Sequence, residues 1–334
     1  MNTDYMQSVF ILPETLANWP WKRDINPYYV EVKAESSAWI RNFTISTPGV
    51  QQSFDAGDFD LLGALAYPLE SKDVLRAGCY LMKLFFLFDE YTDVATPHEA
   101  QEQANIVMDA IRNPDKERPI GECVLGEAAR QFWILSSKFA CDGARRRFVE
   151  TFEEYTASVV QQAEDRAQNY IRNVDDYLRV RRNTIGVKPS LVILQFGLNL
   201  PDGVFEDPVI QKLSTACVDM ISIDNDLCSY NIEQARGDEG HNIVTAVMHS
   251  ENLGLNEAMR WIGNYHAKLA CNFLNDLRDV PSFGDKFQGG VERYLNGMAN
   301  WVTANKCWHF ESHRYFAESG LAIQQSRKVV LLPR

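Results

Sequence analysis

The sequence predicts an all-α protein that folds as one domain, residues 1–334. Apolar residues recur at helical spacing in long segments, strand patterns are nearly absent, and no internal repeat or convincing linker divides the 334 residues. Hydrophobic residues make up 46% of the chain and aromatic residues 11%, which is enough to bury an ample core. We therefore expect a single bundle of helices.

The first half of the chain begins with a segment of a different kind. Residues 1–27 contain three prolines and two tryptophans, which predicts an ordered but irregular strap that packs through its aromatic rings. Asn26 and Pro27 suit the cap and first turn of the helix that follows. A loop through Pro48 and Gly49 comes next, and Pro68, Pro97 and the Asn113-Pro114 pair separate later segments. Helices are expected at residues 28–43, 54–67, 71–92, 98–112, 121–140 and 148–170.

The second half contains one predicted interruption. Gly186 and Pro189 fall within an otherwise helical stretch, residues 175–200, and predict a break or kink that frees backbone carbonyls. Residues 235–242 are rich in charge and glycine, which is typical of a mobile loop, either one that closes over a site or an ordinary surface connection. Further helices are expected at residues 208–234, 243–249, 255–277 and 286–311.

The charge balance excludes several classes of partner. A net charge of −12 and a pI near 5.0 argue against nucleic acid and against an anionic membrane surface. The seven cysteines have no CxxC spacing and are expected to be reduced thiols, so we predict a cytoplasmic protein without stable membrane insertion. The histidines show no metal-ligand spacing, and no HExxH, GxxxxGK or GxSxG signature is present.

An apolar run ends abruptly in acidic residues between Leu81 and Asp93. Asp89 and Asp93 are four residues apart, so on a helix both project from the face that carries Phe85 and Phe86. Carboxylates at the rim of an apolar hollow repel each other unless a cation lies between them, and Mg2+ suits such oxygen ligands. Asp89, Glu90 and Asp93 are therefore candidate metal ligands, with a solvated helix end as the alternative.

Two further polar groups fit the same chemistry. Asn225, Ser229 and Glu233 recur every four residues and form one oxygen-bearing stripe on a helix, which can chelate a hard cation. The alternative is the polar face of an amphipathic helix. Arg314 and Tyr315 place a guanidinium beside a phenol, a pair of donors that suits phosphate oxygens.

In this order along the chain, the three motifs resemble those of class I terpene cyclases. The chain is most similar to the sesquiterpene synthases of mushroom-forming fungi, and the similarity extends to the Asn18-Trp19-Pro20-Trp21 and Asn26-Pro27-Tyr28 stretches near its start. It departs from the family pattern at Glu90, where some members have a second aspartate. It departs again at Ile232, where many relatives have a lysine that contacts the diphosphate.

The resemblance implies a fold, a cofactor and a reaction. The fold would be an α-helical bundle around an apolar cavity, and the two metal motifs would bind three Mg2+ ions, with Mn2+ as a possible substitute. The enzyme would be a carbon–oxygen lyase acting on phosphates, with farnesyl diphosphate as substrate. Arg182, four residues before Gly186, would be the diphosphate sensor, with Arg314 and Tyr315 as further donors.

Aromatic side chains are the remaining candidates for the site. Aromatic faces attract carbocations without donating a lone pair that would trap them. Phe85 and Phe86 lie next to the acidic motif and are expected to line the cavity. Trp308 is a further candidate, with a place in the core as its alternative.

Several questions stay open at this level. The first ring closure is either 1,11, leading to a humulyl cation and protoilludene-type products, or 1,10, leading to germacrane or cadinane skeletons. A prenyl chain elongation enzyme and a non-catalytic isoprenoid-binding helical protein are alternative functions. The protein is a monomer or a homodimer, and Arg179 and Arg181 compete with Arg182 for the sensor role.

Overall fold

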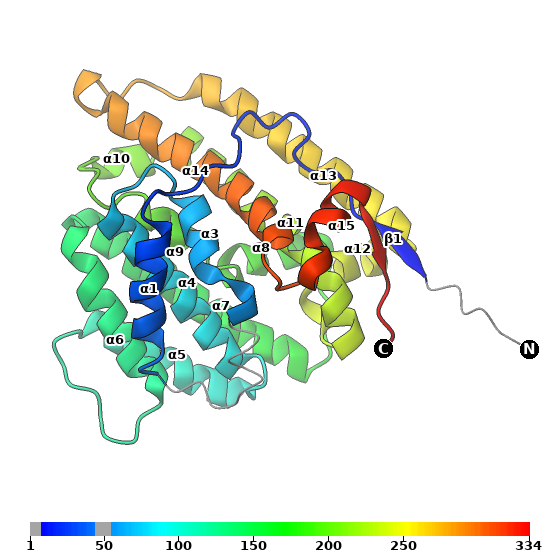
Figure 1. The fold of residues 1–334 in the computed structure, drawn as a ribbon, viewed down its shortest axis with the longest axis horizontal. Helices are drawn as coiled ribbons and strands as arrows, with labels where there is room; N and C mark the ends of the chain where they lie inside the picture. Colours follow the sequence, from blue (N-terminus) through cyan, green and yellow to red (C-terminus); the bar gives the residue numbers. More distant parts are fainter. Residues whose placement is uncertain (1–7, 44–54) are drawn as a thin grey trace, which may run out of the picture.

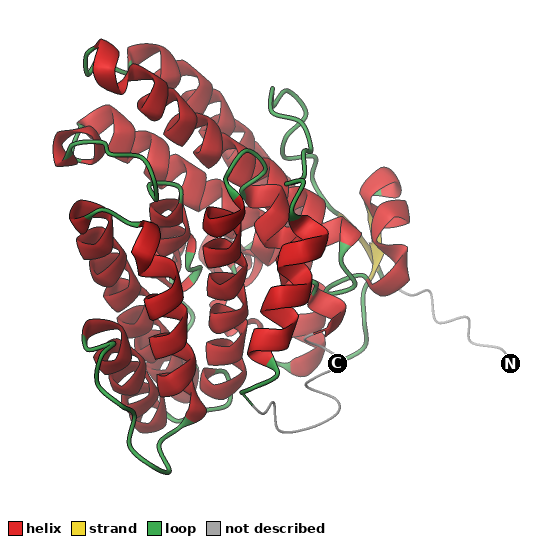
Figure 2. Cartoon of the chain, turned by 60° about the vertical axis from the view of Figure 1, so that its left-hand side comes forward, coloured by secondary structure: helices red, strands yellow, loops and turns green. Residues whose placement is uncertain are grey.

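The computed structural model describes residues 8–43 and 55–334 as helices joined by short connections, with one two-stranded ribbon (Figures 1 and 2). The predicted all-α fold is confirmed. The helices are α1 (Tyr29–Ile40), α3 (Phe59–Ala66), α4 (Lys72–Thr92), α5 (Pro97–Arg112), α6 (Val124–Ser136), α7 (Asp142–Ala167), α8 (Val174–Thr184), α9 (Val187–Ile193), α10 (Asp202–Phe205), α11 (Pro208–Arg236), α12 (Ile243–Glu251), α13 (Leu255–Asp276), α14 (Asp285–Glu311) and α15 (Gly320–Ser326).

Helix starts follow local capping chemistry. The Ser71 side chain accepts a hydrogen bond from the backbone N–H of Val74 at the start of α4. Thr96 and Glu99 form a reciprocal capping box at the start of α5, where Pro97 occupies the first turn. These side chains satisfy backbone N–H groups that the helix itself leaves without a partner.

Most predicted helices agree with the structure to within a few residues, and the described residues contain only two short strands, in keeping with the near absence of strand patterns. Helix α7 begins at Asp142 rather than at residue 148, and α10 and α15 were not predicted. The Pro48–Gly49 loop, the expected helix start at Phe54 and residues 1–7 of the strap lie outside the described residues. In the part of the chain that is described, no helix is long and apolar enough to cross a membrane.

Helix α4 runs through the middle of the molecule. It packs against α1, α3 and α6, and most of its side chains are buried. Helix α11 packs against α13 and α14 on the other side of the bundle. The two helices that carry the candidate metal motifs are therefore both core helices, and each is held on several faces.

The ends of the described chain lie side by side. Strand β1 (Val9–Ile11) pairs antiparallel with β2 (Lys328–Val330), and Phe10 faces Val329 in the register (Figure 1). Residues 12–27 then run over α13 and α14. Trp19 packs on Phe273 at a ring-centroid distance of 5.1 Å and donates from Nε1 to the carbonyl of Ala299. This irregular segment covers one side of the bundle with its aromatic rings.

The predicted interruption of the helix is present. Helix α8 ends at Thr184, and α9 begins at Val187 after Gly186 adopts a left-handed conformation with φ of 71°. A Cβ atom at residue 186 would lie 3.0 Å from the Phe85 ring, so a larger residue would be both strained and crowded. The break is therefore packed directly against helix α4.

Candidate active site

A cavity of about 190 Å3 lies among helices α4, α7, α8, α9, α11 and α14. Apolar and aromatic side chains form part of its lining, and the acidic and basic residues that interact with one another form what we call its polar end. Its lining includes Leu62, Met82, Phe85, Phe86, Asp89, Asp93, Tyr155, Val159, Gln162, Arg181, Thr184, Ile185, Val187, Ile221, Asn225, Glu233, His241, Trp301, Asn305, Trp308, Arg314 and Tyr315.

The acidic end of α4 contributes Asp89 and Asp93 to this cavity. Burial, followed by the charge of Asp93, raises the pKa of Asp89 to about 7. The Tyr155 hydroxyl donates a hydrogen bond of 3.0 Å to Asp89 Oδ1. Burial also raises the pKa of Asp93. Glu90, the third acidic residue of the motif, does not line the cavity.

The second stripe faces this end from helix α11. Asn225 accepts a hydrogen bond at Oδ1 from Arg181 Nη2, at 2.8 Å, and donates from Nδ2 to the Tyr315 hydroxyl, at 3.1 Å. Burial, followed by the nearby charge of Asp226, raises the pKa of Glu233 to about 7. Ser229 is buried between Asn225 and Glu233 on the helix but does not itself line the cavity.

The structure places the Arg182 side chain away from the cavity lining. Its guanidinium forms a two-pronged ion pair with Asp219, at 2.7 and 2.9 Å, and does not line the cavity. Arg181 does line the cavity. The two neighbouring arginines reach different places because adjacent residues of a helix point about 100° apart. Arg179 pairs with Asp176 near the surface.

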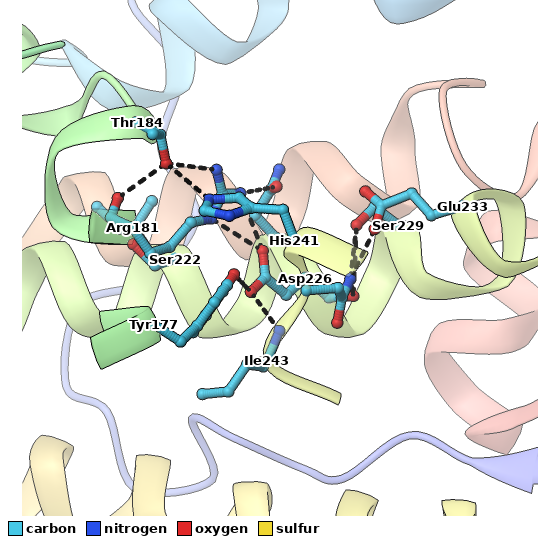
Figure 3. A network of polar contacts seen from close by, with 12 residues as sticks. Tyr177, Arg181, Thr184, Ser222, Asp226, Ser229, Glu233, His241 and Ile243 are labelled. Atoms are coloured by element: carbon cyan, nitrogen blue, oxygen red, sulfur yellow. Dashed lines mark hydrogen bonds and ion pairs between the residues drawn. The ribbon is translucent and has the colours of Figure 1, made fainter. Parts of the chain in front are cut away.

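Arg181 belongs to a buried polar network that joins α8 to α11 (Figure 3). Its Nε donates to Asp226 Oδ1 at 3.0 Å, and Tyr177 makes a short hydrogen bond to the other carboxylate oxygen of Asp226. The Thr184 hydroxyl lies 3.3 Å from His241 Nε2. The network fixes the Arg181 side chain so that its second nitrogen reaches Asn225.

Sequence reasoning did not single out Asp226 or Tyr155, and it preferred Arg182 to Arg181, which is the arginine that lines the cavity. One signal was available: Tyr177, Arg181 and Thr184 are spaced at i, i+4 and i+7, which puts them on one helix face. That face meets α11 at Asp226 and Asn225, whereas Arg182 contacts α11 at Asp219, about two turns nearer its start. Nothing in the sequence pattern distinguishes Tyr155 from the other aromatic residues of α7.

Aromatic rings form one wall of the cavity. Phe85 packs edge-on against Tyr155 at 4.8 Å between ring centroids, and Phe86 stacks on Phe59. Trp308 also lines the cavity, although it is 1% exposed and donates from Nε1 to the Gly57 carbonyl at 2.7 Å. All three predicted aromatic residues, Phe85, Phe86 and Trp308, therefore meet at the same cavity.

Arg314 lies between this wall and the polar end. Its guanidinium is centred 5.1 Å from the Phe86 ring, and Tyr315 follows it at the cavity surface. A guanidinium stacked on aromatic faces keeps its N–H groups directed outward in the ring plane, where they can bind an anion.

The helix break supplies polar backbone beside Phe85 of the aromatic wall. Ile185 lines the cavity, and Pro189, four residues later, has no N–H to donate to the Ile185 carbonyl. The Gly186 carbonyl accepts a hydrogen bond of 2.8 Å from the Ser190 hydroxyl. The predicted release of a carbonyl from helical bonding thus applies to Ile185 rather than to Gly186.

The donor set fits a hard divalent cation that binds together with a phosphate ligand. Asp89, Asp93, Asn225 and Glu233 offer oxygen atoms, which Mg2+ prefers. Over the described ranges, 8–43 and 55–334, no three acidic, histidine or cysteine side chains gather closely enough to hold an ion by themselves. Mg2+ is usually bound through one or two carboxylates, and substrate phosphates and waters complete its shell.

The fold and this donor set together fit the class of metal-dependent terpene cyclases, and comparison with known proteins shows that class. Residues 80–270 match the model of terpene synthase family 2, C-terminal metal binding. The chain is 49% identical to the Delta(6)-protoilludene synthase of Armillaria gallica over 98% of its own length and 95% of that enzyme. It is also 49% identical to sesquiterpene synthase 14 of Postia placenta, over 97% and 92% of the two chains.

Solved structures agree on the fold. The linalool/nerolidol synthase of Streptomyces clavuligerus, solved with 2-fluorogeranyl diphosphate, has a TM-score of 0.78 and 19% identity over 89% of this chain and 99% of its own. Germacradien-4-ol synthase of Streptomyces citricolor has a TM-score of 0.76 and 21% identity over 87% and 96%. The chain belongs to the terpene synthase family and is a terpene cyclase, a carbon–oxygen lyase, and the predicted resemblance is confirmed.

Proposed function

We propose that this enzyme is a Mg2+-dependent sesquiterpene synthase that converts farnesyl diphosphate to a cyclic hydrocarbon and diphosphate. One observation carries the proposal: the carboxyl groups of Asp89, Asp93 and Glu233 and the guanidinium groups of Arg181 and Arg314 line the same cavity as the aromatic rings of Phe85, Phe86 and Trp308. That arrangement matches a substrate with an anionic head and a hydrocarbon tail. The names of the relatives in Armillaria and Postia support the same substrate class.

The metal ions would be held from two sides. Asp89 and Asp93 would bind on the α4 side, and Asn225, Ser229 and Glu233 on the α11 side, with three Mg2+ ions as in the family pattern. Bound Mg2+ supplies positive charge that stabilises the departing diphosphate. Glu90 does not line the cavity, so we assign it a supporting role within the acidic motif rather than a place among the metal ligands.

The protein's own donors would complete the neutralisation of the diphosphate. Arg181 replaces Arg182 in this proposal, because Arg181 reaches the cavity and is positioned by Asp226. Arg314 and Tyr315 would donate from the opposite side. Fixed donors that face the developing charge stabilise the transition state more than the ground state.

The apolar part of the cavity would then protect the carbocation. Phe85, Phe86 and Trp308 would offer aromatic faces to it, and Ile185, whose carbonyl has no N–H partner at Pro189, also lines the cavity. Residues 235–242 would close the entrance. They border a second cavity of about 300 Å3, which shares Asp93, Glu233 and His241 with the first. Closure would exclude water, which otherwise quenches the cation.

For the product, we propose 1,11 closure and a protoilludene-type skeleton. The support is the identity of 49% to an Armillaria gallica enzyme of that name over nearly the full chain. The contour of the cavity decides the closure, so 1,10 closure is the alternative outcome. We further propose that the enzyme works in the cytoplasm, in keeping with its seven free cysteines.

The test is incubation of purified protein with farnesyl diphosphate, with Mg2+ and with EDTA, followed by gas chromatography and mass spectrometry of the headspace. Hydrocarbons of formula C15H24 that form only with Mg2+ are expected, and a humulyl-derived tricyclic skeleton would establish 1,11 closure. Longer linear diphosphates formed on addition of isopentenyl diphosphate would instead identify a chain elongation enzyme. Binding of farnesyl diphosphate without turnover would identify an isoprenoid-binding protein.

A further inference from the structure

Asn242 is a fully buried residue at the junction of residues 235–242 with helix α12. Its side-chain oxygen accepts a hydrogen bond of 2.9 Å from the Val244 N–H and so caps α12. Its side-chain nitrogen points the other way, toward helix α11. It donates to Glu233 Oε2 at 2.8 Å and to the Asp226 carbonyl at 2.9 Å, and it lies 3.4 Å from Ser229 Oγ.

The capping bond fixes which way this amide faces. Because the oxygen of Asn242 is engaged by the start of α12, only the NH2 group can face α11. The NH2 group meets two residues of the metal stripe, Ser229 and Glu233, and the backbone between Asn225 and Ser229. The Asn242 side chain thus links the last two members of the stripe, although Asn242 lies outside the stripe itself.

The contact with Glu233 has a direct consequence for its carboxylate. A glutamate side chain has several rotatable bonds, and ordering it costs conformational entropy. The hydrogen bond from Asn242 holds Oε2 of Glu233, a residue that lines the cavity. A neutral amide donor holds the carboxylate without neutralising its charge, so its capacity to bind a cation is kept.

We propose that Asn242 is a positioning residue for the second metal stripe. It holds the Glu233 carboxylate and the Ser229 hydroxyl in position to bind a divalent cation. It also connects these two groups to residues 235–242, which border the entrance. This inference rests on the proposed function, in which Ser229 and Glu233 are metal ligands. Residues that orient metal ligands in this way typically change metal affinity by about 10- to 100-fold when they are replaced.

The capping role and the positioning role can be separated by mutation. Serine caps helices about as well as asparagine, so Asn242→Ser keeps an acceptor for the Val244 N–H. Serine has no donor that can span the distance to Glu233. The matched control is Asn173→Ser, because Asn173 caps helix α8 in the same way but is exposed and contacts Asp176 rather than the metal stripe.

The experiment measures Mg2+ binding by isothermal titration calorimetry in the presence of inorganic diphosphate, which binds without reacting. Asn242→Ser is expected to weaken Mg2+ affinity by about 10- to 100-fold, and Asn173→Ser should leave it unchanged. The thermal unfolding midpoints of the two metal-free variants should be similar. In turnover assays, Asn242→Ser should need more Mg2+ but recover most of its kcat at saturating Mg2+.

The outcomes distinguish this inference from the proposed function. Wild-type affinity for Mg2+ and diphosphate in Asn242→Ser would overturn the positioning role while leaving the proposed function intact. No Mg2+-dependent diphosphate binding by the wild-type protein would count against the proposed function itself. If Asn242→Ser does not fold, Asn242→Asp serves instead: it keeps the cap but turns an oxygen toward Glu233, and wild-type Mg2+ affinity in it would equally overturn the inference.

Discussion

Helix α4 contains buried charge in two places, and the two are balanced in different ways. In its middle, Lys83 is 4% exposed and forms an ion pair of 2.9 Å with Asp60 of α3, which is 3% exposed. Ser36 and Ser37 add hydrogen bonds to the two members of this pair. At its end, Asp89 accepts its hydrogen bond from the neutral phenol of Tyr155, and Asp93 adds a second carboxylate one turn later.

The contrast separates a structural charge from a functional one. The Lys83–Asp60 pair is complete within the protein and faces other core residues, so it needs no further partner. At Asp89 and Asp93, two like charges lie at a cavity wall, and burial raises the pKa of both carboxyl groups. A cation that binds together with the ligand stabilises carboxylates most strongly in this environment.

Removing one member of the complete pair should have the largest effect. Lys83→Met leaves Asp60 buried without its cation and should lower the free energy of unfolding by about 3–5 kcal/mol. Chemical denaturation measures this loss. Replacing both residues, as Lys83→Met with Asp60→Leu, should restore most of the stability. A double variant as unstable as the single one would show that the pair is not the cause.

At the end of α4 we expect the opposite result, a loss of activity without a loss of stability. Asp89→Asn should lower kcat/KM for farnesyl diphosphate by about 10²- to 10³-fold, because it removes a proposed ligand of the metal that stabilises the leaving group. An amide costs less to bury than a carboxylate, so the metal-free variant should unfold at the wild-type temperature or above. Steady-state kinetics and thermal unfolding of the same preparation check both parts. A marked fall in stability would make Asp89 a structural residue like Asp60.

The neighbouring arginines of α8 extend the comparison to cations. Arg181→Lys should lower kcat/KM by about 100-fold, since it removes a positioned donor at the polar end of the cavity. Arg182→Lys should leave kcat/KM near the wild-type value and lower stability by about 1 kcal/mol, because it weakens only the pair with Asp219. The reverse ranking in kinetic assays would return the sensor role to Arg182.

The smallest effect is expected at the phenol that supports Asp89. Tyr155→Phe keeps the ring packed against Phe85 but removes the hydroxyl donor. The Mg2+ concentration for half-maximal rate should rise by about 10-fold, as for other residues that orient metal ligands. Activity measured over a range of Mg2+ concentrations gives the value. An unchanged Mg2+ dependence would mean that Asp89 needs no orientation from α7.

The sequence predicted features that depend on neighbours along the chain. Helix positions follow from periodicity and caps, and the spacing of Asp89 with Asp93 or of Asn225 with Glu233 fixes which side chains share a helix face. The break at Gly186 also follows from local chemistry, because glycine and proline act on their own backbone. These inferences needed no knowledge of which helices pack together.

Tertiary packing decided the rest. The choice between Arg181 and Arg182 depends on which face of α8 meets Asp226, and the role of Lys83 depends on Asp60 arriving from another helix. The pairing of β1 with β2 joins the two ends of the described chain and leaves almost no local signal in three-residue strands. Local sequence restricts the conformation of each segment, but burial and charge compensation depend on groups that only the folded chain brings into contact.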